Sequence, residues 1–512
     1  MLPPSRFVKT FYLVLTLIIA GVLCKRKNVL FLVADDMRPE LGAYYGKDFP
    51  APVYPPMHTP NLDWLASRSL LLKRAYCQVA LCCPSRTSLL TSRRPDTTHI
   101  YGFDKYFRKT AGNFTTIPQY FKENGYESVG MGKVFHAGGC SGNDDPPSWS
   151  EPYFRAPNYH YWSGETKHSW IAVNETAEKN TPLPDTQIAQ NAIKVLKRLG
   201  PVSQKEDKPF FLAVGFHKPH LPFVFPERFL KYYPKEVIRP PANPQAPVNM
   251  PNIAWFNYWD LRTRYKDIDK LNISGAPNHT LPLNITLTLR RAYYSAVTFT
   301  DSLIGDVIQE LIKQNLLDDT IISFWGDHGW KLGEHGAWCK ETNFELDAHA
   351  PMMISVPGYT EKGIQTERLT EFVDLFPTLV EAAGLKPLPL CPINSSSVKT
   401  CTEGDSLIPL MKKTDAKWKT KVFTQFARED WEHPDWMGYS MRTDNFRYTE
   451  WVKWLKDPIN KPDWSILKGV ELYDHTRDPQ ENYNFASDKS YAEIRSRLSK
   501  ELRAGWRKNN NI

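Results

Sequence analysis

The sequence contains few cysteines for its length, with 8 in 512 residues. That number is too small for a fold held together mainly by disulfides, so a buried apolar core must stabilise the protein. Hydrophobic residues make up 41% of the chain, which suffices for such a core and excludes disorder as the main state. We find no zinc-type Cys/His spacing, no long basic tail and no internal repeat. A net charge of +8 suits an acidic or polyanionic ligand but gives no reason to expect nucleic acid.

The apolar run at residues 11–23 is too short for a comfortable membrane span. Arg6 and Lys9 precede it, and the combination is typical of a secretory signal peptide. We therefore expect residues 1–24 to be a signal peptide, with no stable membrane insertion after its cleavage. An uncleaved anchor is the alternative.

Six Asn-x-Ser/Thr sequons accompany this segment and together predict a glycosylated protein of the secretory pathway. That compartment permits disulfides. Cys391 and Cys401 bracket a short polar loop and are the pair that we expect to be bonded, whereas the partners of Cys77, Cys140 and Cys339 stay open. The sequons begin at Asn113, Asn174, Asn272, Asn278, Asn284 and Asn394.

Predicted strands alternate with predicted helices over most of the chain. Residues 28–33 form a continuous apolar run, typical of a buried parallel strand, and Asp35 and Asp36 follow it. The alternation favours an α/β fold with a large, mostly parallel, doubly wound sheet between helices. Residues 138–183 and 221–285 lack a period, so we expect long irregular loops there. Further strands are expected at 127–131, 210–214, 320–325 and 352–356, and helices near 59–66, 116–124, 185–199, 286–315 and 373–383.

The pattern changes after about residue 410, where short strands follow one another without long helices between them. This is typical of a small antiparallel sheet, closed here by a charged helix from about 489 to 506. We therefore expect a catalytic domain at 25–410 and a C-terminal α+β subdomain at 411–512. The strands of the subdomain are expected at 422–426, 437–442, 446–452 and 470–473.

Polar side chains follow four of the predicted strands. Sites in open α/β sheets lie beyond the carboxyl ends of strands, so we expect these groups to meet. Carboxylates gathered there would repel one another unless a cation neutralised them, and oxygen ligands with one imidazole suit Ca²⁺ or Mg²⁺. Singly, each group is more often a helix cap, a structural histidine or a solvated lysine. The groups are Asp35 with Asp36, Lys133 with His136, His217 with His220, and Asp327 with His328, and Lys340 follows a Gly-rich loop at 329–336.

Residues 81–91 place two thiols, a proline and an arginine at the start of a helix-compatible run. Pro84 suits the first turn of a helix, where backbone donors and the helix dipole favour anions. Two interpretations of Cys82 and Cys83 stay open on this evidence. Each is either a structural thiol or half-disulfide, or a catalytic residue that faces an anionic substrate.

The pentad 82–86 fits the Cys-x-Pro-x-Arg signature of the sulfatase family, which the chain resembles within the alkaline-phosphatase-like superfamily. The resemblance covers nearly all of the mature chain and implies the sulfatase-like fold. It also implies that the formylglycine-generating enzyme oxidises Cys82, and not Cys83, to formylglycine during secretion. The chain departs from the family at Ser92, where Gly is usual, and at about 140–183, which is shorter and lacks a cysteine pair of a vertebrate lysosomal member. Matching segments include 90–91, 93–98, 111–126, 210–223, 327–336, 391–401, 437–443, 471–474 and 478–479.

The resemblance further implies a role for each polar residue at the strand ends. Arg86 would steady the formylglycine hydrate, and Lys133 and Lys340 would bind the sulfate oxygens. His136 would serve the hydrate, and His220 would lie near the leaving oxygen. The implied Ca²⁺ ligands are Asp35, Asp36, Asp327 and His328, with the formylglycine derived from Cys82 completing the shell.

An aldehyde hydrate offers two hydroxyls for this chemistry. One, activated by the metal, would attack sulfur and displace the sugar alcohol, which His220 would protonate. The other, deprotonated toward His136, would then expel sulfate. Lys133, Lys340 and Arg86 would stabilise the spreading negative charge.

The resemblance therefore implies a sulfuric ester hydrolase that removes the 2-O-sulfate from terminal iduronate of the sulfated glycosaminoglycans heparan and dermatan sulfate. The enzyme would act in the lysosome, reached through the secretory pathway, or alternatively outside the cell. Arg442 and Arg447 are candidates for binding the substrate carboxylate. The alternatives are a sulfatase for another sulfated sugar and a secreted glycan-binding pseudoenzyme.

Overall fold

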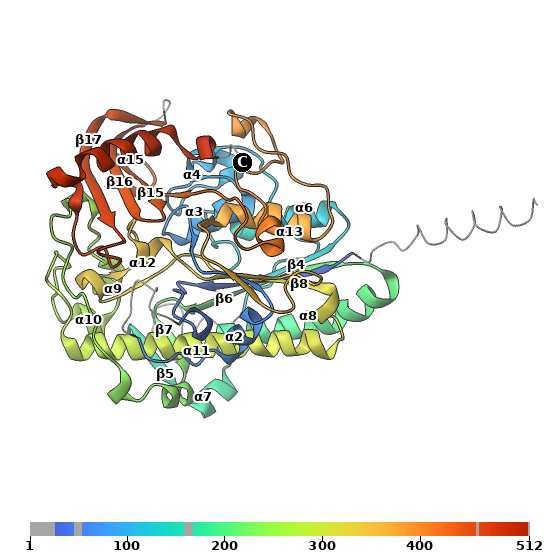
Figure 1. Cartoon of the computed structure of the whole chain (residues 1–512). Coiled ribbons are helices and arrows are strands. Elements are labelled where there is room, and N and C mark those ends of the chain that lie inside the picture. Colours follow the sequence, from blue (N-terminus) through green and yellow to red (C-terminus); the bar gives the residue numbers. More distant parts are fainter. Residues whose placement is uncertain (1–25, 46–53, 158–166, 457–459, 510–512) are drawn as a thin grey trace, which may run out of the picture.

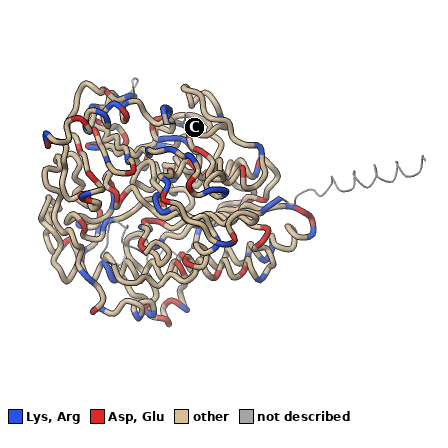
Figure 2. Tube along the Cα trace, in the orientation of Figure 1, with Lys and Arg blue, Asp and Glu red and all other residues tan. Residues whose placement is uncertain are grey.

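The computed structural model describes residues 26–45, 54–157, 167–456 and 460–509. The predicted signal peptide at 1–24 lies outside these ranges. Within them, no helix combines the length and the apolar character needed to cross a membrane. Basic and acidic residues are interspersed along the trace (Figure 2). All six sequon asparagines are exposed, so each is accessible for glycosylation.

A seven-stranded sheet forms the centre of the protein (Figure 1). In spatial order, its strands are β12 (Ile364–Thr366), β2 (Leu70–Leu72), β11 (Met352–Ser355), β8 (Thr320–Gly326), β1 (Asn28–Asp35), β6 (Phe210–Pro219) and β4 (Glu127–Gly132). β8, β1, β6 and β4 are neighbours and run parallel. Among the described strands of this sheet, only β11 is antiparallel to its neighbours. The prediction of a large, mostly parallel sheet is confirmed.

Helices cover both faces of this sheet, because successive residues of a strand point to opposite faces. Leu30 and Leu32 of β1 belong to the apolar core on one face, and Val29 and Phe31 to the core on the other. The predicted doubly wound arrangement is therefore present (Figure 1). The first core is closed by α2 (Pro60–Ala66), α8 (Pro184–Glu206) and α11 (Leu283–Lys313), and the second by α3 (Cys82–Thr91), α6 (Ile117–Glu123) and α13 (Leu375–Ala382).

The two regions predicted as irregular loops contain regular structure, so the predictions for 138–183 and 221–285 are wrong in part. β5 (Trp170–Val173) and β7 (Phe223–Pro226), one from each region, pair in a two-stranded parallel sheet. These strands are short and their partners lie far apart in the chain, so no local period reveals them. The α-helices that lie wholly within the described parts of these regions are α7 (Glu175–Asn180), α9 (Trp259–Arg264) and α10 (Lys266–Asp269).

The chain ends in a four-stranded antiparallel sheet, as predicted. Its strands are β14 (Lys421–Arg428), β15 (Trp436–Thr443), β16 (Phe446–Leu455) and β17 (Lys461–Asp474), in that order. α15 (Ala492–Ala504) packs on this sheet through Leu498 and Leu502, which share an apolar cluster with Met441 and Leu472. β17 begins earlier than predicted because its first half is largely exposed and shows no alternation of apolar residues.

Short elements connect the larger ones. Two further strand pairs are β3 (Ala75–Tyr76) with β13 (Thr370–Glu371), and β9 (Lys331–Leu332) with β10 (Trp338–Cys339). The remaining short α-helices are α4 (Pro95–Thr98), α5 (Phe107–Thr110), α12 (Glu345–Ala348) and α14 (Ile408–Lys412).

His349 is expected to make the protein less stable in acid. It is 4% exposed, and its burial lowers the pKa to about 4, an effect that Glu345 opposes and Arg74 and Arg442 reinforce. An unfolded histidine has a pKa of about 6.5. Between these values the unfolded state binds a proton that the native state does not, so stability falls as the pH falls. The loss approaches about 3 kcal/mol near pH 4.

Urea unfolding at pH 7 and pH 4.5 measures this effect. Between these two values, His349→Gln should lose about 2 kcal/mol less stability than the wild type. His433→Gln is the matched control, because the His433 side chain is 60% exposed. Equal acid sensitivity in His349→Gln and the wild type would contradict the prediction.

Candidate functional site

Four neighbouring strands end at one edge of the main sheet, each beside polar side chains. Because β8, β1, β6 and β4 are adjacent and parallel, their carboxyl ends coincide there. Gly215 in β6 permits a close approach between two of these strand ends, since a Cβ at that position would lie 2.2 Å from the backbone of Lys133. In strand order, the side chains delivered are Asp327 and His328, Asp35 and Asp36, His220, and Lys133 and His136.

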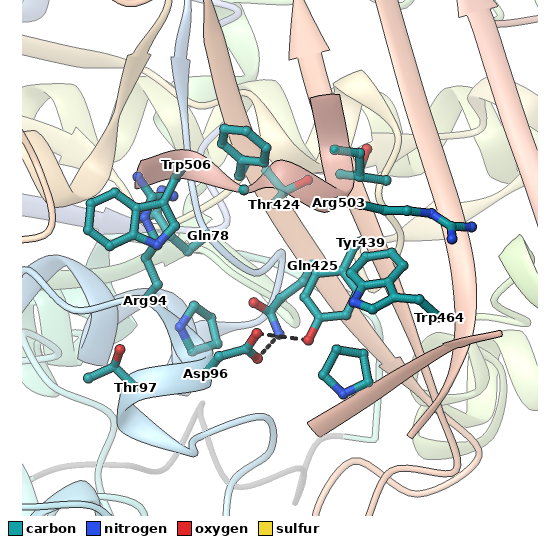
Figure 3. A pocket seen from close by; sticks show the side chains of 16 residues that line it. Gln78, Arg94, Asp96, Thr97, Thr424, Gln425, Tyr439, Trp464, Arg503 and Trp506 are labelled. Atoms are coloured by element: carbon teal, nitrogen blue, oxygen red, sulfur yellow. Dashed lines mark hydrogen bonds between the residues drawn. The ribbon is translucent and has the colours of Figure 1, made fainter. Parts of the chain in front are cut away.

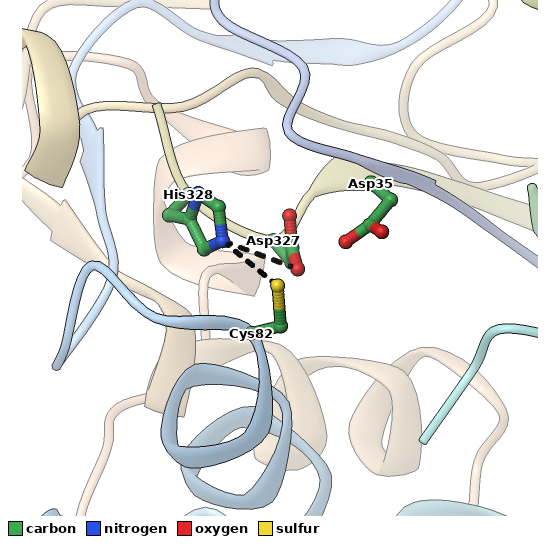
Figure 4. A group of neighbouring side chains, drawn as sticks. All are labelled: Asp35, Cys82, Asp327 and His328. Carbon is green, nitrogen blue, oxygen red and sulfur yellow. Dashed lines mark hydrogen bonds and ion pairs between the residues drawn. The ribbon is translucent and has the colours of Figure 1, made fainter. Parts of the chain in front are cut away.

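Cys82 is the first residue of α3, and its buried side chain points to this edge (Figure 4). Its Sγ lies 3.4 Å from Nε2 of His328, 3.4 Å from Nζ of Lys340 and 3.9 Å from Nζ of Lys133. Burial, together with a neighbouring carboxylate, raises the pKa of the Cys82 thiol well above its usual value. The unmodified thiol is therefore a weak nucleophile. Four residues offer ligand atoms within 4.8 Å of one another: Asp35, Cys82, Asp327 and His328.

Arg86 forms hydrogen bonds with groups at the ends of β1, β8 and β4. Its guanidinium donates to Asp35 at 2.9 Å and to Asp327 at 3.0 Å, and it also donates to the carbonyls of Lys133 and, at 3.1 Å, Val134. Arg86 is fully buried. These contacts orient the carboxylates at the ends of β1 and β8 and the segment that follows β4.

Two lysines lie close to Cys82. Lys133 is paired with Asp35, and Lys340 with Asp36 at 2.6 Å. Burial alone would lower the pKa of each lysine, but the carboxylates outweigh it and raise the pKa of both. Both lysines are therefore charged and offer positive charge for an anion bound beside residue 82.

The carboxylates fit a hard divalent cation. Oδ2 of Asp36 is buried and makes no hydrogen bond. Burial and the other carboxylates raise the pKa of Asp36 and of Asp327, whereas Lys133 and Arg86 hold the pKa of Asp35 well below its usual range despite its burial. A cation bound among these oxygens would have the unbonded Oδ2 as a ligand and would relieve the repulsion between the carboxylates.

Two half-buried histidines lie at the outer side of the cluster. Nδ1 of His136 and Nδ1 of His220 each face the carbonyl of the next residue in the chain, so the neutral rings carry their proton on Nδ1. Nε2 of His220 lies 3.8 Å from Oδ2 of Asp36, and the His136 ring packs on Phe103 at 4.8 Å. Burial and the charge of Lys133 lower the pKa of both histidines, to about 3 for His136.

Three residues named from the sequence do not join the cluster. His217 is bound by Asp185 of α8, at 2.9 Å from its Nδ1. Arg442 and Arg447 are paired with Glu345, and Arg447 also with Glu481 at 2.7 Å. Both arginines are buried and neutralise buried carboxylates, so the prediction that one of them binds a substrate carboxylate is wrong.

A second disulfide lies beside the cluster. The predicted Cys391–Cys401 bond is confirmed, and Cys83 is bonded to Cys140, while Cys82 remains a free thiol. The Cys83–Cys140 bond joins the first turn of α3 to the segment that follows His136. Neither cysteine has a local sequence signal that identifies the other as its partner.

Removal of the Cys83–Cys140 disulfide is expected to destabilise the protein strongly. The two cysteines are 57 residues apart, and closing a loop of that length in the unfolded chain is worth about 4 kcal/mol. The Cys83→Ala/Cys140→Ala variant should lose that amount in non-reducing urea unfolding. Cys391→Ala/Cys401→Ala is the matched control, with a separation of 10 residues and an expected loss of about 3 kcal/mol. A loss below about 1 kcal/mol in the first variant would contradict the prediction.

Ser92 ends α3 in the left-handed conformation, with a φ of +51°. Helices commonly end in this conformation with glycine, because other residues are strained there. The Ser92 hydroxyl donates to the carbonyl of Val373 at 2.5 Å and lies 2.8 Å from Oγ1 of Thr402. These bonds offset the strain and explain how the chain accommodates serine where its resemblance leads one to expect glycine.

Known proteins with similar sequences agree with the site geometry. Residues 27–385 match the Sulfatase family model, and residues 333–508 match the model of the C-terminal part of N-sulphoglucosamine sulphohydrolase. Iduronate 2-sulfatase of Homo sapiens is 37% identical over an alignment of 517 positions, which covers 90% of this chain and 91% of that protein. Iduronate 2-sulfatase of Mus musculus is also 37% identical, with 91% of each chain covered.

Solved structures share the fold. A phosphonate monoester hydrolase from Silicibacter pomeroyi superposes with a TM-score of 0.68 at 19% identity, covering 94% of this chain and 96% of that one. A structure solved with D-glucosamine-2-N,6-O-disulfate as its substrate gives a TM-score of 0.67 at 20% identity, covering 95% and 99%. At these identities the likeness concerns the fold alone.

Proposed function

The chain belongs to the sulfatase family, and on that premise we propose that it removes the 2-O-sulfate from terminal iduronate of heparan or dermatan sulfate. One observation carries the proposal: Sγ of Cys82 lies within 3.9 Å of Lys133, Lys340 and His328, beside three buried carboxylates. The choice of sugar is supported by the 37% identity to two iduronate 2-sulfatases over about nine-tenths of the chain.

The residues present fit the two groups that this reaction needs. Formylglycine at position 82, made by the formylglycine-generating enzyme during secretion, would supply a hydroxyl nucleophile, and Ca²⁺ would supply positive charge beside it. Carboxylates that outnumber neutral ligands favour Ca²⁺, which accepts more protein oxygens than Mg²⁺ does. The residues that would hold Ca²⁺ are Asp35, Asp36, Asp327 and His328.

The remaining residues bind, orient and move protons. Lys133 and Lys340 would bind the sulfate oxygens and stabilise their negative charge in the transition state. Arg86 acts by positioning, since it holds the carboxylates and the Lys133 segment in register. His136 would take a proton at Nε2 from the hydroxyl at position 82. His220 would deliver a proton to the leaving sugar oxygen from Nε2, which must first be protonated because the neutral ring carries its proton on Nδ1.

The cavity next to His136 supports a sugar substrate and limits its charge. Phe103, which packs on His136, lines a cavity of about 750 Å³. Aromatic side chains there suit the apolar faces of sugar rings. Carboxylates outnumber cations in the lining, which disfavours further sulfates on the neighbouring sugar. The aromatic lining residues include Trp255, Trp259 and Trp431, the acidic ones are Asp104, Glu429, Asp430 and Glu432, and Arg428 is the cation.

These charges also favour a second candidate, a sulfatase for another sulfated sugar. Arg442 and Arg447 are occupied by glutamates and the cavity lining is acidic, so neither supplies the cation that a uronate substrate requires. The intact set of Cys82, the carboxylates, the lysines and the histidines argues against a secreted glycan-binding pseudoenzyme, which would use the lysines to bind sulfate but would need no precursor of a nucleophile.

Sulfate release from defined monosulfated sugars tests the proposal. The secreted protein should act on a 2-sulfated iduronide with a kcat/KM at least about tenfold above that on glucosamine 6-sulfate or galactosamine 4-sulfate, the discrimination that a few unmatched contacts provide. A reversed preference would support the second candidate. Release from none of these substrates, with Cys82 fully converted to formylglycine, would overturn the assignment.

We also propose the domain boundaries of the enzyme and the compartment in which it acts. Residues 25–410 would form the catalytic domain and 411–512 the C-terminal subdomain, after removal of 1–24. The lysosome is the expected site of action on the basis of the predicted signal peptide and the family resemblance, and extracellular action is the alternative. Fractionation of cells that express the full chain separates the two.

A further inference from the structure

Tyr293 of α11 is bonded to the turn that carries Asp36. Its hydroxyl donates to the carbonyl of Asp36 at 2.8 Å and accepts from the backbone N–H of Arg38 at 3.0 Å. The side chain is fully buried, and its ring packs edge-on against Phe223 of β7, with 5.6 Å between the ring centroids. One hydroxyl therefore satisfies two backbone groups of the segment that follows β1.

Asp36 has a backbone conformation that needs such support. Its φ is +58°, in the left-handed region that residues other than glycine rarely occupy. A residue remains in that region only where its surroundings hold it. The N–H of Asp36 donates to Oδ1 of Asp327 at 2.9 Å, and its carbonyl accepts from Tyr293. Both backbone ends of the residue are thereby fixed, and with them the direction in which its carboxylate leaves the chain.

A buried charged network joins the same turn to the loop that carries Lys340. Arg38 donates to both carboxylate oxygens of Glu334, at 3.2 and 3.3 Å. Arg290 of α11 donates to the same carboxylate at 3.0 Å. These contacts anchor the turn and the loop to one helix, which keeps Nζ of Lys340 within 2.6 Å of Oδ1 of Asp36.

We infer that Tyr293 is a positioning residue for the cation site. Its hydroxyl fixes the turn that places the Asp36 carboxylate beside Asp35 and Cys82, whose ligand atoms lie within 4.8 Å of it. A cation then meets a preformed arrangement and does not have to order the turn as it binds, which is the general role of groups behind metal ligands. The inference rests on the proposed function, which places Ca²⁺ among these carboxylates.

Calorimetric titration with Ca²⁺ tests the inference on the secreted protein after dialysis against a chelator. Tyr293→Phe keeps the ring and removes the hydroxyl, so the dissociation constant for Ca²⁺ should rise by about 10–100-fold, the cost of losing a group behind a metal ligand. Excess Ca²⁺ should then restore sulfate release, because the ligands themselves are unchanged. A tyrosine that merely stabilised the fold would leave the dissociation constant unaltered.

Two other tyrosines supply matched controls. Tyr294 is the next residue of α11, equally buried, and its hydroxyl makes no hydrogen bond within the described part of the chain. Tyr439 lines a separate cavity of about 180 Å³ between α4 and the C-terminal sheet, where its hydroxyl donates to Asp96 at 2.7 Å (Figure 3). Tyr294→Phe controls for the loss of a buried hydroxyl, and Tyr439→Phe for the loss of a hydrogen bond away from the site. Both variants should bind Ca²⁺ like the wild type.

Amide hydrogen exchange in the unaltered protein covers the case in which Tyr293→Phe does not fold. Coupling between two binding events is reciprocal, so if the Tyr293 hydroxyl strengthens Ca²⁺ binding, bound Ca²⁺ strengthens the bonds of that hydroxyl by the same factor. The Arg38 amide, which donates to this hydroxyl, should therefore exchange at least about tenfold more slowly with Ca²⁺ than without it. The amides of the C-terminal sheet should not change.

Three results would overturn the inference. They are equal Ca²⁺ dissociation constants for Tyr293→Phe and Tyr294→Phe, equal exchange of the Arg38 amide with and without Ca²⁺, and a wild type that binds no Ca²⁺. A failure of the proposed function is distinct from these, because it is seen as absent sulfate release in a wild type that binds Ca²⁺ and has formylglycine at position 82.

Discussion

Cys82→Ala is expected to abolish sulfate release while leaving the fold intact. Loss of a nucleophile from a preorganised site lowers kcat on the order of 10⁵–10⁶-fold, because the surrounding charges have no bond-forming group to assist. The thiol itself makes no disulfide, and its nearest contacts are long, at 3.4–3.9 Å. The free energy of unfolding should therefore change by less than about 1 kcal/mol. Urea unfolding measures this change, and the rate of sulfate release measures the loss of kcat.

The neighbouring cysteine supplies the matched control for this prediction. Cys83→Ala/Cys140→Ala keeps the residue at position 82 but loses the disulfide, so it should lose stability and retain activity per folded molecule within about tenfold. Peptide mass spectrometry of the wild type should find formylglycine at Cys82 and the disulfide at Cys83. Unmodified thiol at Cys82 in fully active protein would contradict the assignment, as would full activity in Cys82→Ala.

The strand-end groups could be predicted because each depends on local sequence and one general rule. A run such as 28–33 identifies a buried strand, and Asp35 and Asp36 then lie at its carboxyl end wherever the strand sits in the sheet. Parallel neighbours bring further ends to the same edge. The placement of Asp327, His328 and Lys133 follows from the same reasoning.

The partners of long-range contacts could not be predicted in this way. Arg442 and Arg447 have the same local pattern as exposed strand arginines, and only the packing of α12 against the C-terminal sheet places Glu345 between them. The pairing of β5 with β7 and the Cys83–Cys140 bond likewise join segments whose separation carries no periodic signal. Lys340 was named because it follows a Gly-rich loop at 329–336, but only the family resemblance gave it a role, since nothing local distinguishes it from a solvated lysine.

Removal of the divalent cation is expected to have the second-largest effect. Chelation should lower kcat by about 10²–10³-fold, the usual cost of losing one electrostatic group that stabilises the transition state. It should also lower the free energy of unfolding by about 3–4 kcal/mol, if the cation is otherwise present at 100–1,000 times its dissociation constant. After dialysis against a chelator, thermal unfolding measures the loss of stability and sulfate release measures the loss of kcat. Ca²⁺ should restore stability and activity at a lower concentration than Mg²⁺.

Asp36→Asn separates a cation site from a merely structural carboxylate cluster. Burial and neighbouring carboxylates make the charged form of Asp36 unfavourable without a cation, which its raised pKa reflects. Without a cation, the variant should therefore be at least as stable as the wild type. Loss of a residue that only supports a metal ligand lowers metal affinity by about 10–100-fold. Loss of the ligand itself should cost more, so Ca²⁺ should stabilise the variant only at a concentration more than about 100-fold higher than for the wild type. Asp318→Asn, at a side chain that is 97% exposed, is the control and should respond to Ca²⁺ like the wild type. An unchanged Ca²⁺ response in Asp36→Asn would show that the unbonded Oδ2 binds no cation, because that oxygen is the ligand atom that the substitution removes.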